Sequence, residues 1–181
     1  MKKLILIIAF LIPFQVFGKV TDHVKSYRSM RLALQVKMIE EALPHIEFPD
    51  IRIDDKIKLR SNNGVKSENI IGWHSFGLIY LRSNANIYHA THEIGHAFFN
   101  NSEWPHCEVL ATEYAIKSYP YTGFLEDKAE YFVLYMFGGE RLRRLAKYDD
   151  CVRKKYDIIK GTIKKEYNGW HWGGYNSGAP E

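Results

Sequence analysis

The stretch HATHEIGHAFF (His89–Phe99) places three histidines, one glutamate and one glycine inside a pattern that otherwise reads as a buried helix. On a helical wheel of about 100° per residue, the apolar side chains of this region fall on one side: Ile87, Ala90, Ile94, Ala97 and Phe98. His92 and His96 fall almost opposite, with Glu93 beside them. The spacing therefore predicts a helix over about residues 86–101 that packs its apolar stripe on a sheet and turns its imidazoles towards a cleft.

The H-E-x-x-H spacing within this helix is typical of a zinc site. Histidines four residues apart stand one turn apart, about 6 Å along the axis, so both rings can bind one zinc ion at about 2.0–2.1 Å. Glu93 would lie within reach of a metal-bound water as its general base, and Gly95 leaves room for another element to press close. His89 lies seven residues from His96, about 10.5 Å of rise, so it is excluded as a ligand and expected beside the site or facing substrate. The alternative is that His92 and His96 are ordinary histidines of a surface helix.

A catalytic zinc usually takes three protein ligands and leaves one position for water. The metzincin pattern would place a histidine at position 102, which is a serine here, and His106 is a candidate by type in an expected loop. Downstream glutamates on expected helices are better placed: Glu108, Glu113, Glu126 and Glu130.

The expected helix over residues 124–137 singles out two of these glutamates. Glu126 and Glu130 share its apolar face, whereas Asp127 and Lys128 are expected to point away; the apolar neighbours are Leu125, Ala129, Phe132, Val133, Met136 and Phe137. Two carboxylates within an apolar face are costly to bury without a cation or strong donors. Zinc and a histidine N–H would satisfy both, one carboxylate as ligand and the other orienting a ligand. The alternatives are glutamates at the edge of an amphipathic helix, and Glu113 as the ligand.

HEIGH (residues 92–96) followed by EDKAEYF (residues 126–132) resembles the gluzincin metallopeptidases related to the anthrax lethal factor catalytic domain and the clostridial Pro-Pro endopeptidases. The second motif of that group is E-x-x-x-E with alanine before the second glutamate. The resemblance implies that Glu126 is the zinc ligand and that Glu130 is its companion. It also implies that Tyr119, seven residues before Glu126, stabilises the tetrahedral intermediate, although Tyr121 competes for that role.

The resemblance covers about Leu78 to Phe137, and the 30 residues from His96 to Glu126 are fewer than this group leads one to expect. It implies a zincin-like fold in which the strand before the active helix lines the bound peptide. That strand would be GLIYLR (residues 77–82), with Ile79–Leu81 as its rim.

The rest of the chain predicts one α+β domain, with a small mixed sheet, an active-site helix and a mainly helical C-terminal half. Helical spacing within residues 20–46 is followed by period-two alternation in FPDIRIDDKIKLRS (residues 48–61) and by a hairpin in IIGWHSFGLIYLR (residues 70–82) around Gly72–Gly77. Besides the histidine helix, four helices are expected after residue 83: 106–118, 124–137, 139–147 and 150–167.

The first eighteen residues, MKKLILIIAFLIPFQVFG, have two lysines, an apolar run and small residues before position 19, the layout of a secretory signal peptide. A membrane anchor is the alternative, but the run is short for a span and Pro13 interrupts it. The mature domain, residues 19–181 with a tail from about 168, would carry 23 basic and 21 acidic residues, so nucleic acid is not an expected partner. In an oxidising compartment Cys107 and Cys151 can pair, the alternative being two free thiols.

These patterns together predict a secreted zinc endopeptidase that holds one Zn²⁺ through His92, His96 and Glu126 and uses Glu93 and Tyr119 in catalysis. Its expected partner is a protein or peptide substrate, and the mature chain is expected to be a monomer without stable membrane insertion. One alternative is a zinc-binding protein without catalysis. Another is a cell-wall or carbohydrate-binding module that uses Trp170 and Trp172 of the aromatic tail.

Overall fold

The structure, a computed structural model, describes residues 27–53, 71–75, 77–107 and 123–164. Within these ranges the chain forms four helices and one three-stranded sheet, which confirms the α+β class. In chain order the elements are α1 (Tyr27–Ala42), β1 (Asp50–Ile53), β2 (Gly72–Ser75), β3 (Leu78–Leu81), α2 (Ile87–Phe99), α3 (Phe124–Ala146) and α4 (Asp150–Ile163). Residues 108–118 of the expected helix over 106–118, the part of the expected strand beyond Ile53 and the signal-like residues 1–18 lie outside the described residues, whereas residues 106 and 107 are described and are not helical.

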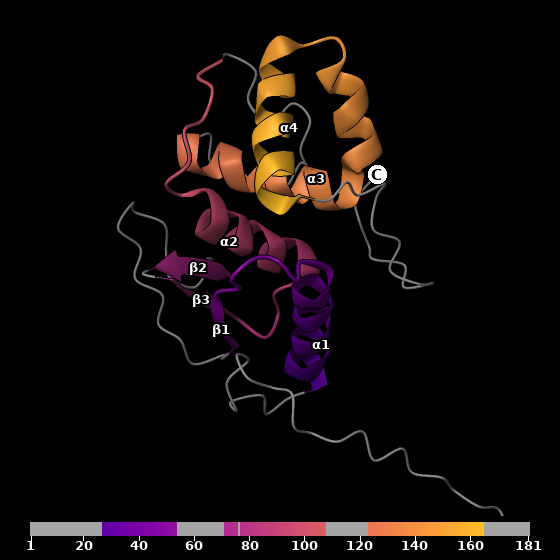
Figure 1. Cartoon of the computed structure of the whole chain (residues 1–181). Coiled ribbons are helices and arrows are strands. Elements are labelled where there is room, and N and C mark those ends of the chain that lie inside the picture. The colour runs from indigo at the N-terminus through magenta and orange to yellow at the C-terminus, as the bar shows by residue number, and fades with distance from the viewer. Residues whose placement is uncertain (1–26, 54–70, 76, 108–122, 165–181) are drawn as a thin grey trace, which may run out of the picture.

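Helix α2 is the central element of the fold. Figure 1 shows α1 and the sheet on one side of α2 and the α3–α4 pair on the other. Asn86 caps the N-terminus of α2, since its side-chain oxygen accepts the His89 N–H at 3.1 Å. Apolar side chains on both sides of α2 are fully buried, including Ile79 of β3, Ile94 of α2 and Phe132 of α3. The helix that carries the histidines is therefore enclosed by two layers, and its polar side chains must find partners within the protein.

The strand order is β1-β3-β2, with β3 parallel to β1 and antiparallel to β2. Strand β3 thus has a neighbour on each side, and the expectation that Ile79–Leu81 pairs with a bound peptide is wrong because its backbone groups already bond to β1 and β2. Within the described sheet, β2 is an edge strand. Gly72 begins β2 rather than the turn, and Gly77, which the structure describes in the connection, has a left-handed backbone with a φ of 77°.

Helices α2 and α3 approach closely at Gly95, as the sequence predicts. A methyl group at Gly95 would lie only 2.9 Å from Ala129 Cα, so glycine allows the two backbones to touch. The expected helices 124–137 and 139–147 form the single element α3, whose backbone leaves helical geometry at Gly138 (φ −123°, ψ 30°). The close approach at Gly95 brings the first turns of α3 over the histidine face of α2.

Asp127 and Lys128 point away from the face that carries Glu126, as expected, but both are buried. The Lys128 ammonium donates to the backbone carbonyls of Phe99, Asn100 and Ser102 at 3.0, 3.2 and 2.7 Å, just past the end of α2. Asp127 Oδ2 accepts from Trp104 Nε1 at 2.6 Å and lies 2.7 Å from Lys155 Nζ. A helical wheel indicates one buried face for α3. In the structure a second face is also buried, against the segment after α2 and against α4.

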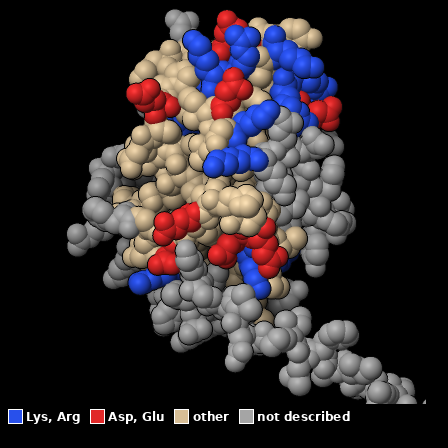
Figure 2. Space-filling view, in the orientation of Figure 1, with Lys and Arg blue, Asp and Glu red and all other residues tan. Residues whose placement is uncertain are grey.

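A disulfide joins Cys107, after α2, to Cys151, in the first turn of α4, with their Cα atoms 6.2 Å apart. The expected pairing is confirmed. Figure 2 shows lysine and arginine side chains gathered over the α3–α4 end of the molecule. None of the described helices is both long and apolar enough to cross a membrane.

Candidate metal centre

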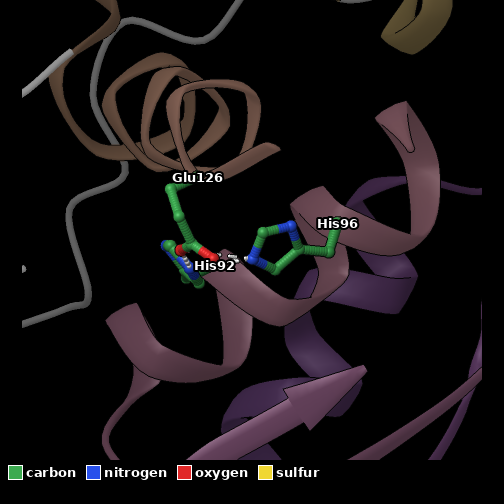
Figure 3. Close-up of side chains that lie close together, drawn as sticks. All are labelled: His92, His96 and Glu126. Carbon is green, nitrogen blue, oxygen red and sulfur yellow. Dashed lines mark hydrogen bonds and ion pairs between the residues drawn. The ribbon is translucent and has the colours of Figure 1, made fainter. Parts of the chain in front are cut away.

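Three of the predicted ligands meet between α2 and α3 (Figure 3). Nε2 of His92 lies 3.1 Å from Nε2 of His96 and 2.9 Å from Oε2 of Glu126. The third side of this triangle, from His96 Nε2 to Glu126 Oε2, is 3.5 Å. Among the described residues this is the one group of three or more candidate ligands close enough to hold a single metal ion.

The triangle has the size that a zinc ion requires. Four tetrahedral ligands bound at about 2.0–2.1 Å are about 3.3 Å from one another. The measured separations of 2.9, 3.1 and 3.5 Å lie around that value. Neutral imidazole nitrogens and a carboxylate oxygen bring lone pairs together at this point, and these repel unless a proton or a cation lies among them. The donor set therefore fits a metal ion.

Glu130 supports the centre from behind, as the sequence predicts. Its Oε1 lies 2.8 Å from Nδ1 of His92, on the side of the ring away from the triangle, and Glu130 is only 7% exposed. A proton on Nδ1 donates to this carboxylate and leaves the lone pair of Nε2 directed at the other two ligands. Glu130 thereby fixes both the tautomer and the orientation of His92, the arrangement found behind most metal-binding histidines.

The carboxylates around His92 favour positive charge at this place. Burial disfavours the imidazolium, but hydrogen bonds to Glu126 and Glu130 outweigh it and raise the pKa of His92 to about 9. Burial also acts against ionisation of Glu126, yet its hydrogen bonds to His92 and His96 lower the pKa of Glu126 to about 2. The pocket thus stabilises an anionic Glu126 beside a cation, which is also the charge balance that a bound metal would satisfy.

Glu93 lies next to this cluster and is 6% exposed. Burial raises the pKa of its carboxyl, against the opposing charges of His96 and His92. Gly72 of β2 makes room for it, because a methyl group there would lie 2.7 Å from Glu93 Cγ and 2.8 Å from Oε1. The side chain of Glu93 is therefore held between the edge strand and the metal ligands. The sequence analysis did not predict this role of Gly72, although a glycine inside an apolar strand is typical of a close approach by another group.

The remaining predicted residues fall into two groups. His89 is not a ligand, as the helical rise predicts; its Nδ1 accepts the Asn86 N–H at 3.3 Å and completes the cap of α2. His106 is exposed and does not belong to the ligand group, so this candidate third ligand is not used. Several candidates lie outside the described residues: Glu108, Glu113, Tyr119, Tyr121, Trp170 and Trp172.

One further histidine near the centre was missed by the sequence analysis. His74 is half-buried on β2, two residues after Gly72, and so on the same face of the strand. Burial, and next the positive charge of His96, lower the pKa of His74. In the sequence, His74 is a polar residue two positions after an inward-facing glycine. This pattern can be interpreted only when the position of the strand in the sheet is known.

Comparison of the chain with protein families, with curated proteins and with solved structures gave no match. The interpretation of the centre therefore rests on its residues and their geometry.

Proposed function

We propose that this chain is a secreted zinc-dependent endopeptidase with a zincin-like fold. The observation that carries the proposal is the convergence of two imidazoles and a carboxylate from two helices, with a buried glutamate directly beside them. A site that only stabilises a fold has no use for an additional buried carboxylate next to its ligands, whereas hydrolysis needs a base at that place.

His92, His96 and Glu126 would hold the zinc ion, and Glu130 would keep His92 in the tautomer that binds it. When bound, zinc lowers the pKa of a coordinated water towards 7 and polarises a substrate carbonyl. Glu126 is 26% and His96 15% exposed, so the ligands reach solvent on one side, where a substrate can approach.

Glu93 is the proposed general base and acid. Its carboxylate takes a proton from the attacking water and then passes that proton to the nitrogen of the departing amine. Burial raises the pKa of Glu93, which makes its carboxylate a stronger base than that of an exposed glutamate. Tyr119 remains the proposed donor to the tetrahedral intermediate, on the strength of the resemblance to gluzincins.

The edge strand β2 is the proposed track for the peptide. The Arg82 N–H donates to the Ile71 carbonyl at 2.9 Å, which makes these two residues a hydrogen-bonded pair across β3 and β2. Such pairs alternate along an antiparallel ladder, so the N–H and C=O groups of Gly72 and His74 point to the outer edge. An extended peptide that adds to this edge passes beside Glu93, which Gly72 contacts.

Export is part of the proposal because of the signal-like residues 1–18 and the Cys107–Cys151 disulfide. Disulfides persist mainly in oxidising compartments. The proposed partner is accordingly a protein or peptide outside the cytoplasm.

The experiment compares wild type with Glu93→Gln, each purified and loaded with zinc, on a peptide library read by mass spectrometry. Glu93→Gln keeps the shape and the ligands but removes the base, so it should bind one zinc per chain and cleave nothing. If wild type binds zinc and cleaves no peptide, or if Glu93→Gln cleaves as fast as wild type, the endopeptidase proposal is wrong. The first of these results would favour the alternative of a non-catalytic zinc-binding protein.

A further inference from the structure

The sheet face that packs against α2 is apolar except at its β2 edge. Ile79 and Leu81 of β3 are fully buried on it, and so are their β1 partners Ile51 and Ile53. Residues directly opposite in neighbouring strands share a face, and the partners of Ile79 and Leu81 in β2 are His74 and Gly72. Within the described sheet, His74 is thus the one titratable side chain on the face towards α2.

The contact at Gly72 shows where this face meets α2. A methyl group at Gly72 would overlap Glu93, so side chains on this face of β2 point towards the side of the centre where Glu93 lies. His74 lies two residues further along the strand, about 7 Å. His96 lies three residues beyond Glu93 on the helix, about 4.5 Å. His74 therefore points towards α2 on the face that meets Glu93 at Gly72, and the charge of His96, second to burial, lowers the pKa of His74, in agreement with a place near Glu93 and His96.

His74 is nevertheless not one of the metal ligands. The group of ligand atoms that converge includes His92, His96 and Glu126 and leaves His74 out. Its side chain is half-buried, so part of it reaches solvent. A histidine that faces the Glu93 side of the centre without joining the converging ligand atoms is available to a substrate bound along the edge strand.

The backbone groups of His74 point in a different direction from its side chain. Its N–H and C=O point to the outer edge of β2, where an added peptide strand would pair, while its side chain points to the centre. One residue thus presents backbone groups to a bound peptide and an imidazole to the place where that peptide would react. No other described residue of β2 combines a polar side chain on this face with outward backbone groups.

We propose that His74 is a catalytic residue of this centre, whose imidazole N–H donates a hydrogen bond to the reacting carbonyl oxygen of the peptide. The inference rests on the proposed endopeptidase function. A neutral imidazole always carries one N–H, and a donor aimed at the oxygen that gains charge stabilises the transition state more than the bound substrate. His74 would supply this donor from the edge strand, in addition to any donor from Tyr119.

The test compares two variants, His74→Phe and His74→Gln, in the full chain loaded with zinc. Phenylalanine keeps a planar ring without a donor, and glutamine keeps an N–H donor of similar reach. His74→Phe should lower kcat by about 100-fold, the usual order for one such donor, with KM changed much less. His74→Gln should recover at least part of that loss. Bound zinc per chain and the melting temperature should match wild type in both variants.

The matched control is His106→Phe, which makes the same replacement at an exposed histidine outside the ligand group and should leave kcat unchanged. The role of His74 is refuted if His74→Phe keeps wild-type kcat, if glutamine is no better than phenylalanine, or if either variant loses zinc or its fold. If wild type cleaves nothing, the endopeptidase proposal falls and the role of His74 falls with it. If wild type is active, Glu93→Gln is inactive and His74→Phe is fully active, the role of His74 alone is wrong.

Discussion

Replacing Gly95 by alanine tests whether the metal centre depends on the close approach of α2 and α3. The added methyl group would lie 2.9 Å from Ala129 Cα, 3.2 Å from Ala129 O and 3.2 Å from Phe132 Cβ. Two of these three atoms are backbone atoms, which cannot turn aside as the end of a long side chain can. The two helices must therefore separate by about 0.5 Å to bring the shortest contact to the 3.4 Å at which ordinary contacts begin.

The substitution Gly95→Ala has two opposing effects on the free energy of unfolding and one effect on the metal centre. Alanine in place of glycine favours a helix by about 1 kcal/mol, whereas overpacking of a core costs about 1–3 kcal/mol. We expect Gly95→Ala to lower the free energy of unfolding by about 1 kcal/mol overall. The distance from His92 Nε2 to Glu126 Oε2, 2.9 Å in the structure, would grow together with the distance to Glu130. Zinc affinity should fall by about 10-fold or more, as it does when the support of a ligand is disturbed.

The control is Gly161→Ala, because Gly161 lies in α4 and a methyl group there meets nothing within 4 Å. It should raise the free energy of unfolding by about 0.5–1 kcal/mol and leave zinc affinity unchanged. Urea denaturation with a chelator present gives the stabilities, and competition with a zinc indicator gives the affinities. The reasoning is refuted if Gly95→Ala is stabilised like Gly161→Ala and binds zinc as tightly as wild type.

Two further predictions concern protons and buried charge. The pKa of His92 is about 9, so in the zinc-free protein the stability that His92 contributes is complete below about pH 6.5 and is lost as the pH rises through 9. The pKa of Glu126 is about 2, so the stability that Glu126 contributes is complete above about pH 4.5 and is lost as the pH falls through 2. Zinc must displace the His92 proton, so titration calorimetry at pH 7 in two buffers of different ionisation enthalpy should count about one proton released; none released would contradict this. Lys155→Met removes the cation 2.7 Å from buried Asp127 and should cost about 3–5 kcal/mol in urea denaturation. Adding Asp127→Leu removes the unpaired carboxylate but also the acceptor of Trp104 Nε1, so it should recover only part of that loss. A single variant as stable as wild type would contradict the role of the pair.

Much of the centre could be predicted from the sequence because its residues follow one helical period. His92 and His96 are one turn apart on α2, and Glu126 and Glu130 are one turn apart on α3, within a face that is otherwise apolar. Local spacing determines which side chains share a face of a helix. The structure brings His92, His96, Glu126 and Glu130 together as that spacing predicts.

The contribution of β2 could not be predicted because it depends on strand order. The proposed role of His74 beside Gly72 depends on the position of β2 at the edge of the described sheet, with β3 between β2 and β1. The resemblance implied that the strand directly before the histidine helix lines the bound peptide, and that expectation is wrong because β3 has a partner strand on each side. The order β1-β3-β2 results from the parallel pairing of β1 with β3, a non-local contact that alternation within single strands does not encode.

The two faces of α3 explain why Asp127 is buried although it points away from the face of Glu126. Glu126 points to the metal ligands, whereas the next two residues point to the other side, where Asp127 meets Lys155 and Lys128 meets the carbonyls at the end of α2. A buried ion pair fixes the register of the element that carries it, because any rotation leaves a charge without its partner. A rotation of the first turn of α3 that carries Glu126 away from His92 would therefore also break the Asp127 pair. Zinc affinity of Lys155→Met should accordingly fall although Lys155 is not a ligand, while the double variant with Asp127→Leu should recover stability more fully than it recovers affinity.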